Sequence, residues 1–300
     1  MISYKSLEIK DKSWIDQIIK QANIMSSDYA FVNNFLWKDF LELDLVDNKN
    51  FFSVFSNRLN SYLFPLLKDP EIDSDNRIIK IINLLKQDAE KKNIRFKLFG
   101  LTIETKTLLN RLFHNKFEYI LRKDMSDYIY NIKDLITLRG KKYHSKRNLV
   151  SQFKTKYYNW EYKSLNKDLL KSCLEVNKEW ISHKKRDDDI LSYESNLASL
   201  AFKYFDELDL FGGAILVNKK IIGFSISYEI NNLVIDNVIE KSLVEYKGVY
   251  NILCQQFLNN IHDNYIYINR EEDLGLENLR KAKLLLHPFL ILDKYDALIL

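Results

Sequence analysis

Hydrophobic residues recur every three or four positions along much of the first half of the chain, which predicts amphipathic helices there. Trp14, Ile15, Ile18 and Ile19 form one such stripe. The period changes in 48–67, where two short β-rich runs flank NRLN and predict a hairpin. In chain order, this half is predicted to contain helices over 11–24 and 26–43, the hairpin, a helix over 77–93, a strand over 94–101, a helix over 104–116 and a strand region over 117–132.

The second half of the chain repeats this order of elements. Residues 211–241 contain three apolar runs separated by NKK and NN, which are turn-type sequences, so three antiparallel strands are expected there. The periodicity on either side predicts a strand over 157–165, helices over 168–184 and 193–208, a helix over 248–262, a strand over 265–271, a helix over 275–286 and a closing strand over 289–298.

The repeated order resembles that of the acyl-CoA N-acyltransferase (GNAT) fold, although order alone leaves other α+β folds open. We therefore predict an α+β protein with two tandem GNAT-like domains, each a mixed, mainly antiparallel sheet flanked by helices. The predicted domains are residues 1–136 and 137–300. A chain of 300 residues, 46% hydrophobic and 29% charged, is long enough and apolar enough to bury two cores.

Positive charge is concentrated in one segment. The net charge is only +4, yet the segment 135–160 contains seven basic residues and no acid. A local basic patch is expected where a protein meets a polyanion on one face, and both RNA and an anionic lipid surface are polyanions. Within it, the predicted nucleic-acid-binding residues are Arg139, Lys141, Lys142, Tyr143, His144, Lys146 and Arg147.

Several classes of protein are disfavoured by the sequence. Cys173 and Cys254 lie in helix-like stretches without metal-ligand spacing, and the five histidines are scattered, so no metal site is predicted. No apolar run approaches the roughly 20 residues of a membrane helix. The N-terminus has no apolar targeting core, so we expect a cytoplasmic protein.

Three motifs carry a more specific resemblance. LRGKKYHSKRNLVSQF (138–153), IEKSLVEYKGVYNIL (239–253) and YINREEDLGLENLRKAK (267–283) occur in this order. Together they resemble the C-terminal domain family of phosphatidylglycerol lysyltransferase, in the form of its short, stand-alone members, over nearly the whole chain. The resemblance implies a tandem GNAT-like fold and, in the lipid-modifying members, transfer of an aminoacyl group from an aminoacyl-tRNA to a lipid hydroxyl.

The sequence also departs from the family pattern. The lipid-modifying members carry a large membrane domain that this sequence does not show, so a small-molecule or lipid-headgroup acceptor is left open. The family pattern has a His before the Ile-Glu-Lys triplet and a Ser-Tyr pair after the Arg…Lys helix, where this chain has Val238 and Leu285-Leu286. These differences leave catalytic competence open as well.

The NREEDLG run places three carboxylates at the end of a predicted strand. Arg280 and Lys283 lie three residues apart on the following helix, so they share a face and can pair with these acids. One interpretation is an ion-pair cluster that fixes the strand to the helix. The other is a substrate site with Asp273 as a catalytic residue and with Asn269, Arg270, Glu271, Arg280 and Lys283 as substrate-binding residues.

The IEKS run ends the central strand and offers a second set of reactive groups. Glu240 is the candidate general base and Lys241 the group that offsets oxyanion charge, unless the pair is structural. Gly248, with Tyr250 and Asn251 after it, opens the next helix, where the GNAT fold binds the pyrophosphate of its cofactor on backbone amides. With a single glycine the junction is a weak signal for coenzyme A, and a tRNA 3′ end would fit the same place.

The basic loop, residues 139–147, has two interpretations of its own. Its lysines and arginines would neutralise phosphates while Tyr143 stacks on a base. Alternatively, the loop is a solvated basic face, or a partner of the acidic run Asp187-Asp188-Asp189.

Three functions follow from these motifs. The first is aminoacyl transfer from an aminoacyl-tRNA donor, with tRNA as partner, to a hydroxyl or amine acceptor. The second is N-acyl transfer from acetyl-CoA or another acyl-CoA. The third is a non-catalytic tRNA- or RNA-binding protein. Peripheral membrane contact through the basic segment is compatible with each.

Overall fold

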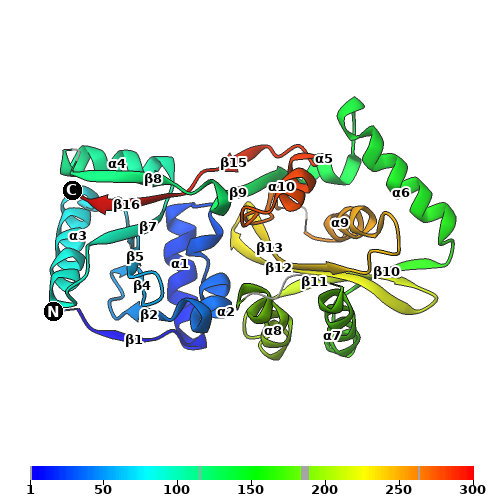
Figure 1. Ribbon diagram of the computed structural model, residues 1–300, viewed down its shortest axis with the longest axis horizontal. Coiled ribbons are helices and arrows are strands. Elements are labelled where there is room, and N and C mark those ends of the chain that lie inside the picture. Colours follow the sequence, from blue (N-terminus) through cyan, green and yellow to red (C-terminus); the bar gives the residue numbers. More distant parts are fainter. Residues whose placement is uncertain (1, 115, 184–188, 263) are drawn as a thin grey trace.

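The molecule is elongated, with one β-sheet at each end (Figure 1). The structure is a computed structural model that describes residues 2–114, 116–183, 189–262 and 264–300. Two seven-stranded sheets and a small two-stranded one, β3 (Phe51–Phe52) with β6 (Leu66–Leu67), are found in these residues. Four short 3-10 helices join them: η1 (Ile9–Asp11), η2 (Ser27–Tyr29), η3 (Lys123–Met125) and η4 (Lys141–Tyr143).

The first large sheet is antiparallel except where β5 runs parallel to β7. Its order is β1 (Tyr4–Ser6), β2 (Leu43–Val46), β4 (Val54–Ser56), β5 (Ser61–Leu63), β7 (Lys97–Leu101), β16 (Tyr295–Ile299) and β8 (Phe117–Leu121). Helices α3 (Ser74–Lys91) and α4 (Ile103–Phe113) bury apolar stripes against it, while α1 (Lys12–Ala22) and α2 (Phe31–Leu41) lie between the two large sheets (Figure 1).

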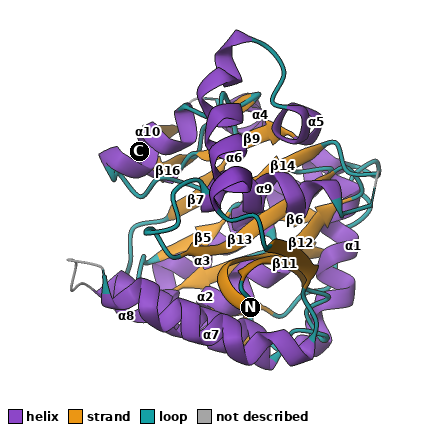
Figure 2. Ribbon diagram, turned by 90° about the vertical axis from the view of Figure 1, so that its right-hand side faces the viewer, coloured by secondary structure: helices purple, strands orange, loops and turns teal. Residues whose placement is uncertain are grey.

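The second large sheet is antiparallel except where β13 runs parallel to β14. Its order is β10 (Trp160–Ser164), β11 (Phe211–Val217), β12 (Lys220–Asn231), β13 (Val234–Ser242), β14 (Tyr267–Asn269), β9 (Asp127–Asn131) and β15 (Leu290–Leu292). Figure 2 shows α7 (Lys167–Ser182) and α8 (Asp189–Lys203) on one face, and α9 (Val249–Asn259), α5 (Ile132–Thr137) and α6 (His144–Lys156) toward the other. Helix α10 (Glu277–Leu284) precedes β15.

The two sheets exchange strands. Strand β9, from the first half of the chain, lies between β14 and β15 of the second sheet, and β16, at the C-terminal end, lies between β7 and β8 of the first. No single point of the chain therefore separates the strands of the first large sheet from those of the second. The boundary between residues 136 and 137 stays a prediction.

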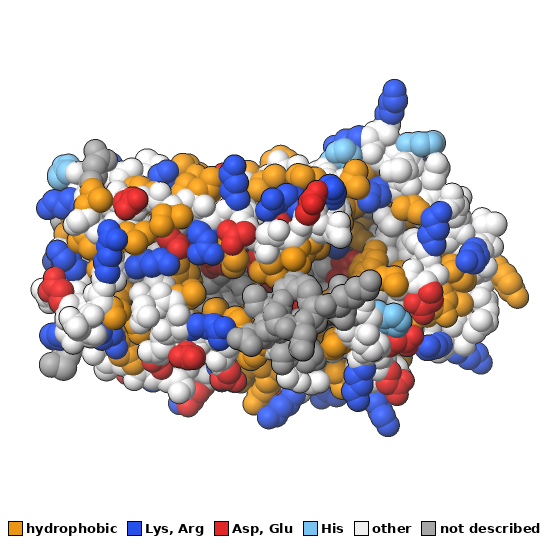
Figure 3. Space-filling model, in the orientation of Figure 1, with side chains coloured by type: hydrophobic (Ala, Val, Ile, Leu, Met, Phe, Trp, Pro, Cys, Tyr) orange, Lys and Arg blue, Asp and Glu red, His pale blue; other side chains and the backbone are white. Residues whose placement is uncertain are grey.

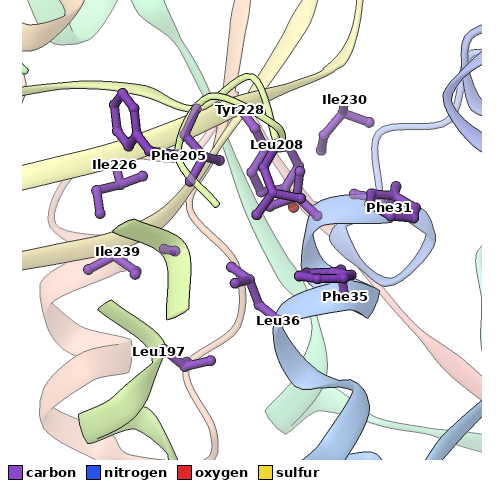
Figure 4. Close-up of a cluster of buried hydrophobic side chains, with 14 of the residues drawn as sticks. Phe31, Phe35, Leu36, Leu197, Phe205, Leu208, Ile226, Tyr228, Ile230 and Ile239 are labelled. Carbon is purple, nitrogen blue, oxygen red and sulfur yellow. The ribbon is translucent and has the colours of Figure 1, made fainter. Parts of the chain in front are cut away.

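A single hydrophobic core joins the two halves. Phe31, Phe35 and Leu36 of α2 point toward residues that follow α8 and toward strands β12 and β13 (Figure 4). The same buried cluster runs from Leu7 to Leu243. The two halves therefore pack as parts of one body.

Most predicted elements are found, but the predicted helix 26–43 and the strand regions 117–132 and 289–298 differ. Within 26–43, helix α2 covers only Phe31–Leu41: the 3-10 helix η2 precedes it, and Glu42 takes the left-handed conformation (φ +50°) before β2 begins at Leu43. The predicted strand regions 117–132 and 289–298 are each two strands that belong to different sheets. The NKK turn is confirmed, since Asn218 and Lys219 both have positive φ, as the tight turn of a hairpin requires.

None of the helices in the described residues combines the length and the low charge that crossing a bilayer requires.

Candidate functional site

A cavity of about 770 Å³ opens where the end of β13, the loop after β14 and helix α10 meet the start of α9. Helices α2, α5, α6, α7 and α8 complete its wall. The residues that line it are Trp37, Leu135, Leu138, Lys146, Trp180, Glu194, Leu197, Asn237, Val238, Ile239, Glu240, Lys241, Tyr250, Asn251, Cys254, Arg270, Glu271, Glu272, Leu274, Leu276, Glu277, Asn278, Leu279, Ala282, Lys283 and Leu286.

Glu240 is fixed through one oxygen and left free at the other. Its Oε2 accepts hydrogen bonds from Asn237 Nδ2 (2.8 Å) and Arg270 Nη2 (2.5 Å). Its Oε1 is buried and makes no hydrogen bond, and the side chain is only 9% exposed. The hydrogen bond from the Arg270 guanidinium is charge-assisted, so it fixes the orientation of the Glu240 carboxylate.

The backbone of β13 explains why Asn237 and Glu240 meet. Tyr228 pairs with Asp236 and Ile226 with Ile239, so β13 carries one extra residue at 237–238. Such a bulge breaks the strict alternation of side chains and re-aims those that follow. Asn237 is itself oriented by the hydroxyls of Ser225 and Ser227, which donate to its Oδ1.

Lys241 lies in the cavity wall beside two partners. Its ammonium pairs with Glu194 and stands 3.6 Å from the centre of the Trp180 ring. Trp180 Nε1 in turn donates to the Tyr250 hydroxyl at 3.0 Å. Burial lowers the pKa of Lys241, and the charge of Glu194 opposes that effect. These contacts connect α7 and α8 to the start of α9.

The loop after β14 contributes Arg270, Glu271 and Glu272. Glu271 has φ +55°, and its buried Oε1 has no hydrogen-bond partner. Burial raises the pKa of Glu271 well above its usual value, and the nearby acids Asp236 and Glu272 raise it further. Lys283 Nζ donates to the carbonyls of Arg270 and, at 3.1 Å, Glu271, and burial lowers its pKa. Helix α10 thereby fixes the shape of this loop.

Asp273 and Arg280 are brought together outside the cavity lining. The Asp273 carboxylate accepts from Tyr128 (2.6 Å), from Arg280 Nε (2.8 Å) and Nη2 (3.0 Å), and from Gly275 N (2.8 Å). Burial alone would raise its pKa, but these bonds hold the pKa of Asp273 below the usual value. This geometry fits the ion-pair interpretation of the motif rather than a catalytic Asp273.

Asn269 belongs to a buried polar cluster behind the cavity. Its Nδ2 donates to Met25 O (2.9 Å) and Asp127 Oδ2 (3.0 Å). Lys294 Nζ lies 2.8 Å from Asp127 and 2.7 Å from Asp28. These two ion pairs connect η2, β9 and the segment between β15 and β16. Asn269 therefore ties the two halves together and does not reach the cavity.

The Gly248 junction is closed by helix α6. Gly248 has φ +92°, and a Cβ at this position would lie 2.7 Å from the carbonyl oxygen of Leu149. Gly248 is absent from the cavity lining, whereas Tyr250 and Asn251 are in it. The junction faces protein at this glycine, which counts against an open pyrophosphate site there.

The basic loop divides into structural and exposed residues. Tyr143 is 1% exposed, packs edge-on against His287 and donates to Leu286 O (3.1 Å), so its ring is not free to stack on a base as the sequence suggested. Arg147 donates to the carbonyls of Leu138 and Gly140 and caps the end of α5. Lys146 is half-buried and lines the cavity, and burial lowers its pKa.

The remaining basic residues face solvent. Arg139, Lys141, Lys142 and His144 are exposed. Lys142 lies 3.7 Å from Asp134 and over the Tyr143 ring. The proposed acidic partner cannot be placed, since Asp187, Asp188 and the side chain of Asp189 lie outside the described residues.

Sequence reasoning missed several residues of the cavity. Trp37, Trp180, Glu194, Asn237 and Cys254 come from four different helices and a strand, and their meeting depends on the packing of the two halves. Asn237 carried a usable signal, because VIDNVIEKS places polar residues in a strand that is otherwise apolar. Within the described part of the chain, no group of three His, Cys, Asp or Glu side chains is arranged to hold a metal ion.

Comparisons with known proteins bear on the family and the fold of the chain. The family model described as phosphatidylglycerol lysyltransferase, C-terminal, matches residues 20–298. An uncharacterized protein from Mycoplasmoides gallisepticum is 28% identical over 180 residues, which is 59% of this chain and 57% of that relative, so the match spans little more than half of the relative's length. A conserved protein of unknown function from Bacteroides thetaiotaomicron, known from a crystal structure, is 30% identical over 100% of both chains, with a TM-score of 0.93.

More distant structures bear on the fold. The C-terminal domain of a putative lysylphosphatidylglycerol synthetase from Agrobacterium fabrum is 11% identical, with a TM-score of 0.65 over 96% of this chain and 91% of that one. A tandem GNAT protein from the clavulanic acid biosynthesis pathway is 7% identical, with a TM-score of 0.52 over 100% of this chain and 98% of that one. These matches confirm the predicted α+β, tandem GNAT-like fold.

Proposed function

This chain belongs to the family of phosphatidylglycerol lysyltransferase C-terminal domains, and on that premise we propose that it transfers an aminoacyl group from an aminoacyl-tRNA to a hydroxyl or amine acceptor. One observation carries the proposal. Glu240 lines a cavity of about 770 Å³; Arg270 and Asn237 fix one of its carboxylate oxygens, and the other oxygen is buried without a hydrogen-bond partner. That is the arrangement that a general base needs beside a bound nucleophile.

In the proposed reaction, the acceptor hydroxyl or amine attacks the carbonyl carbon of the aminoacyl ester. Glu240 takes the proton from the attacking group as the new bond forms, and the carbon–oxygen bond to the tRNA ribose breaks. The ribose hydroxyl leaves with a proton returned by Glu240. Positioning by the cavity and the positive charge of Lys241 near the developing oxyanion supply the rest of the rate enhancement.

The surface near the cavity suits a polyanionic donor. Lys146 lines the cavity, and Arg139 and Lys141 stand exposed on the preceding loop. These positive charges would attract the phosphates of a tRNA 3′ end and direct that end toward Glu240. An acyl-CoA donor is less well supported, because α6 lies against Gly248, where the pyrophosphate would bind.

A non-catalytic RNA-binding role is the second candidate, and one observation favours it. Val238 and Leu286 both line the cavity, at positions where the family pattern has a His and a Tyr. If those side chains are needed for turnover, this chain keeps the cavity and the basic loop but has no transfer activity.

Equilibrium binding tests the donor class. We expect charged tRNA to bind with strong salt dependence and acetyl-CoA not to bind. Replacing Lys141 and Lys142 together by alanine should reduce the slope of affinity against salt by about one for each lost phosphate contact. Arg147 is left intact because it caps α5.

The matched control replaces Lys80 and Lys91, two exposed lysines of α3 in the other half, and should leave tRNA affinity unchanged. Binding of acetyl-CoA without binding of tRNA would overturn the donor proposed here. Binding of tRNA without any transfer would support the second candidate.

A further inference from the structure

The segment 279–291 exposes an unusual number of large apolar side chains. Helix α10 and the edge strand β15 make up most of this segment. We call the exposed set the apolar ridge; Leu285 is 57% exposed and Phe289 63%, and the ridge consists of Leu279, Leu284, Leu285, Phe289, Leu290 and Ile291. Single exposed apolar residues are ordinary, but this many within thirteen residues of sequence point to an interaction surface.

The basic loop lies directly against this ridge. His287, inside the ridge segment, packs on the Tyr143 ring with 5.2 Å between the ring centres, and Tyr143 donates to Leu286 O. Nε2 of His287 is also within 3.1 Å of Lys142 O. Figure 3 shows apolar and basic side chains interspersed along the upper edge of the molecule, where Figure 1 places β15, α10 and α5.

The charge of this surface is positive. Two acidic side chains near the ridge form ion pairs: Glu277 pairs with Lys281 at 2.6 Å, and Asp134 lies 3.7 Å from Lys142. Arg139 and Lys141 are exposed and make no ion pair with any residue that the structure describes. The surface therefore presents apolar groups beside uncompensated positive charge.

This combination selects among possible occupants. A second copy of the chain would bring the same positive charge against itself, and β15 offers only three residues for pairing at the sheet edge. An anionic bilayer instead accepts the apolar side chains among its acyl chains and attracts the flanking lysines and arginines.

We infer that the apolar ridge and the loop 139–142 form a docking surface for an anionic lipid bilayer. Leu285 and Phe289, the most exposed side chains of the ridge, enter the interfacial region while Arg139, Lys141 and Lys142 contact lipid phosphates. Helix α10 also forms one wall of the cavity, so docking brings the cavity beside the headgroups. The inference rests on the exposed residues of this surface and is independent of the proposed transfer.

Vesicle binding tests it directly, with vesicles of phosphatidylcholine alone and vesicles of equal parts phosphatidylcholine and phosphatidylglycerol. The full chain should sediment with the anionic vesicles and not with the neutral ones. Replacing Leu285 and Phe289 together by glutamine should lower the partition coefficient of the protein onto anionic vesicles by about tenfold or more, because two apolar side chains are then no longer transferred from water to the bilayer. Each removed charge among Arg139, Lys141 and Lys142 should weaken it by about fivefold.

The control variant carries glutamine at Leu59 and Ile72, which are exposed apolar residues of the first half, and should bind as the unchanged chain does. A second probe, Phe289→Trp, should show a blue-shifted emission on anionic vesicles and quenching by brominated lipid. The inference is overturned if the chain does not bind anionic vesicles, if the ridge variant binds like the control, or if the ridge variant converts a dimer into a monomer instead. None of these results depends on whether transfer is observed.

Discussion

At the scale of single residues, the carboxylates of the site differ in their hydrogen-bond partners. Glu240 has a guanidinium partner and one free oxygen, whereas Glu271 has a buried oxygen without any partner and a raised pKa. Asp273 is fully bonded and outside the cavity lining. These surroundings support the role of general base proposed for Glu240 and a structural role for Asp273, and the raised pKa of Glu271 means that it is protonated more readily than an ordinary glutamate.

Asp236, behind the cavity, leads to a prediction about stability and pH. Burial raises its pKa to about 7, against the hydrogen bond from Tyr228 and with added repulsion from Asp127 and Glu272, while Lys294 acts in the opposite direction. Between about pH 4 and about pH 7, Asp236 is therefore protonated in the folded state and ionised in the unfolded state. The contribution of this proton to the free energy of unfolding is complete below about pH 4 and is lost as the pH rises through about 7.

The Asp236→Asn variant removes this titration. Its free energy of unfolding, measured by urea denaturation from about pH 5 to about pH 8, should fall less with rising pH than that of the unchanged chain. Asp39→Asn, at an exposed position, serves as the control and should follow the unchanged chain. An Asp236→Asn variant with the same pH dependence as the unchanged chain would show that another group carries the proton.

At the scale of secondary structure, periodicity was sufficient for most helices, although not for α5, and for the three antiparallel strands β11, β12 and β13. It failed in the strand region 117–132. The polar run RKDMSD (122–127) divides this region, and η3 lies there and separates β8 from β9, which belong to different sheets. Nothing in the local pattern distinguishes those two partners, because the choice depends on strands far away in sequence.

The candidate site was predictable to a similar degree. Glu240, Lys241, Arg270, Glu271 and Lys283 were identified from two motifs, and the structure brings them around one cavity. Whether they act in catalysis stays a prediction. The aromatic and acidic wall from α7 and α8 was not identified, because helical spacing makes Trp180 look like an ordinary core residue.

The contact between α6 and the start of α9 can be tested at Gly248. An alanine there meets both an unfavourable φ of +92° and the Leu149 carbonyl at 2.7 Å. Gly248→Ala should lower the free energy of unfolding by about 2 kcal/mol or more. Gly275→Ala is the matched control, since its φ is also positive (+73°) but its nearest neighbour is 3.7 Å away.

Gly275→Ala should therefore cost only the backbone strain, about 1 kcal/mol. Equal losses for the two variants, measured by chemical denaturation, would show that α6 does not close this junction.

At the scale of the whole molecule, the exchange of β9 and β16 makes each sheet depend on both halves of the chain. A fragment 1–136 would lack β16 between β7 and β8, and a fragment 137–300 would lack β9 between β14 and β15. The shared core between α2, β12 and β13 adds to this dependence (Figure 4).

We therefore expect neither fragment to fold alone and the two to form a stable complex when refolded together. Circular dichroism of the separate fragments and size-exclusion chromatography of the mixture measure this. Cooperative unfolding of each isolated fragment would contradict the expectation and would support a domain boundary between residues 136 and 137.

Single-turnover transfer from charged tRNA, with a lipid or amine acceptor in excess, tests directly whether Glu240 acts as the base in aminoacyl transfer. We expect the unchanged chain to transfer the aminoacyl group and Glu240→Gln to lower the rate by about a hundredfold or more, with the same fold and tRNA affinity. Glu118→Gln, at an exposed position on β8, should leave the rate unchanged. Transfer at the full rate by Glu240→Gln would show that Glu240 is not the base.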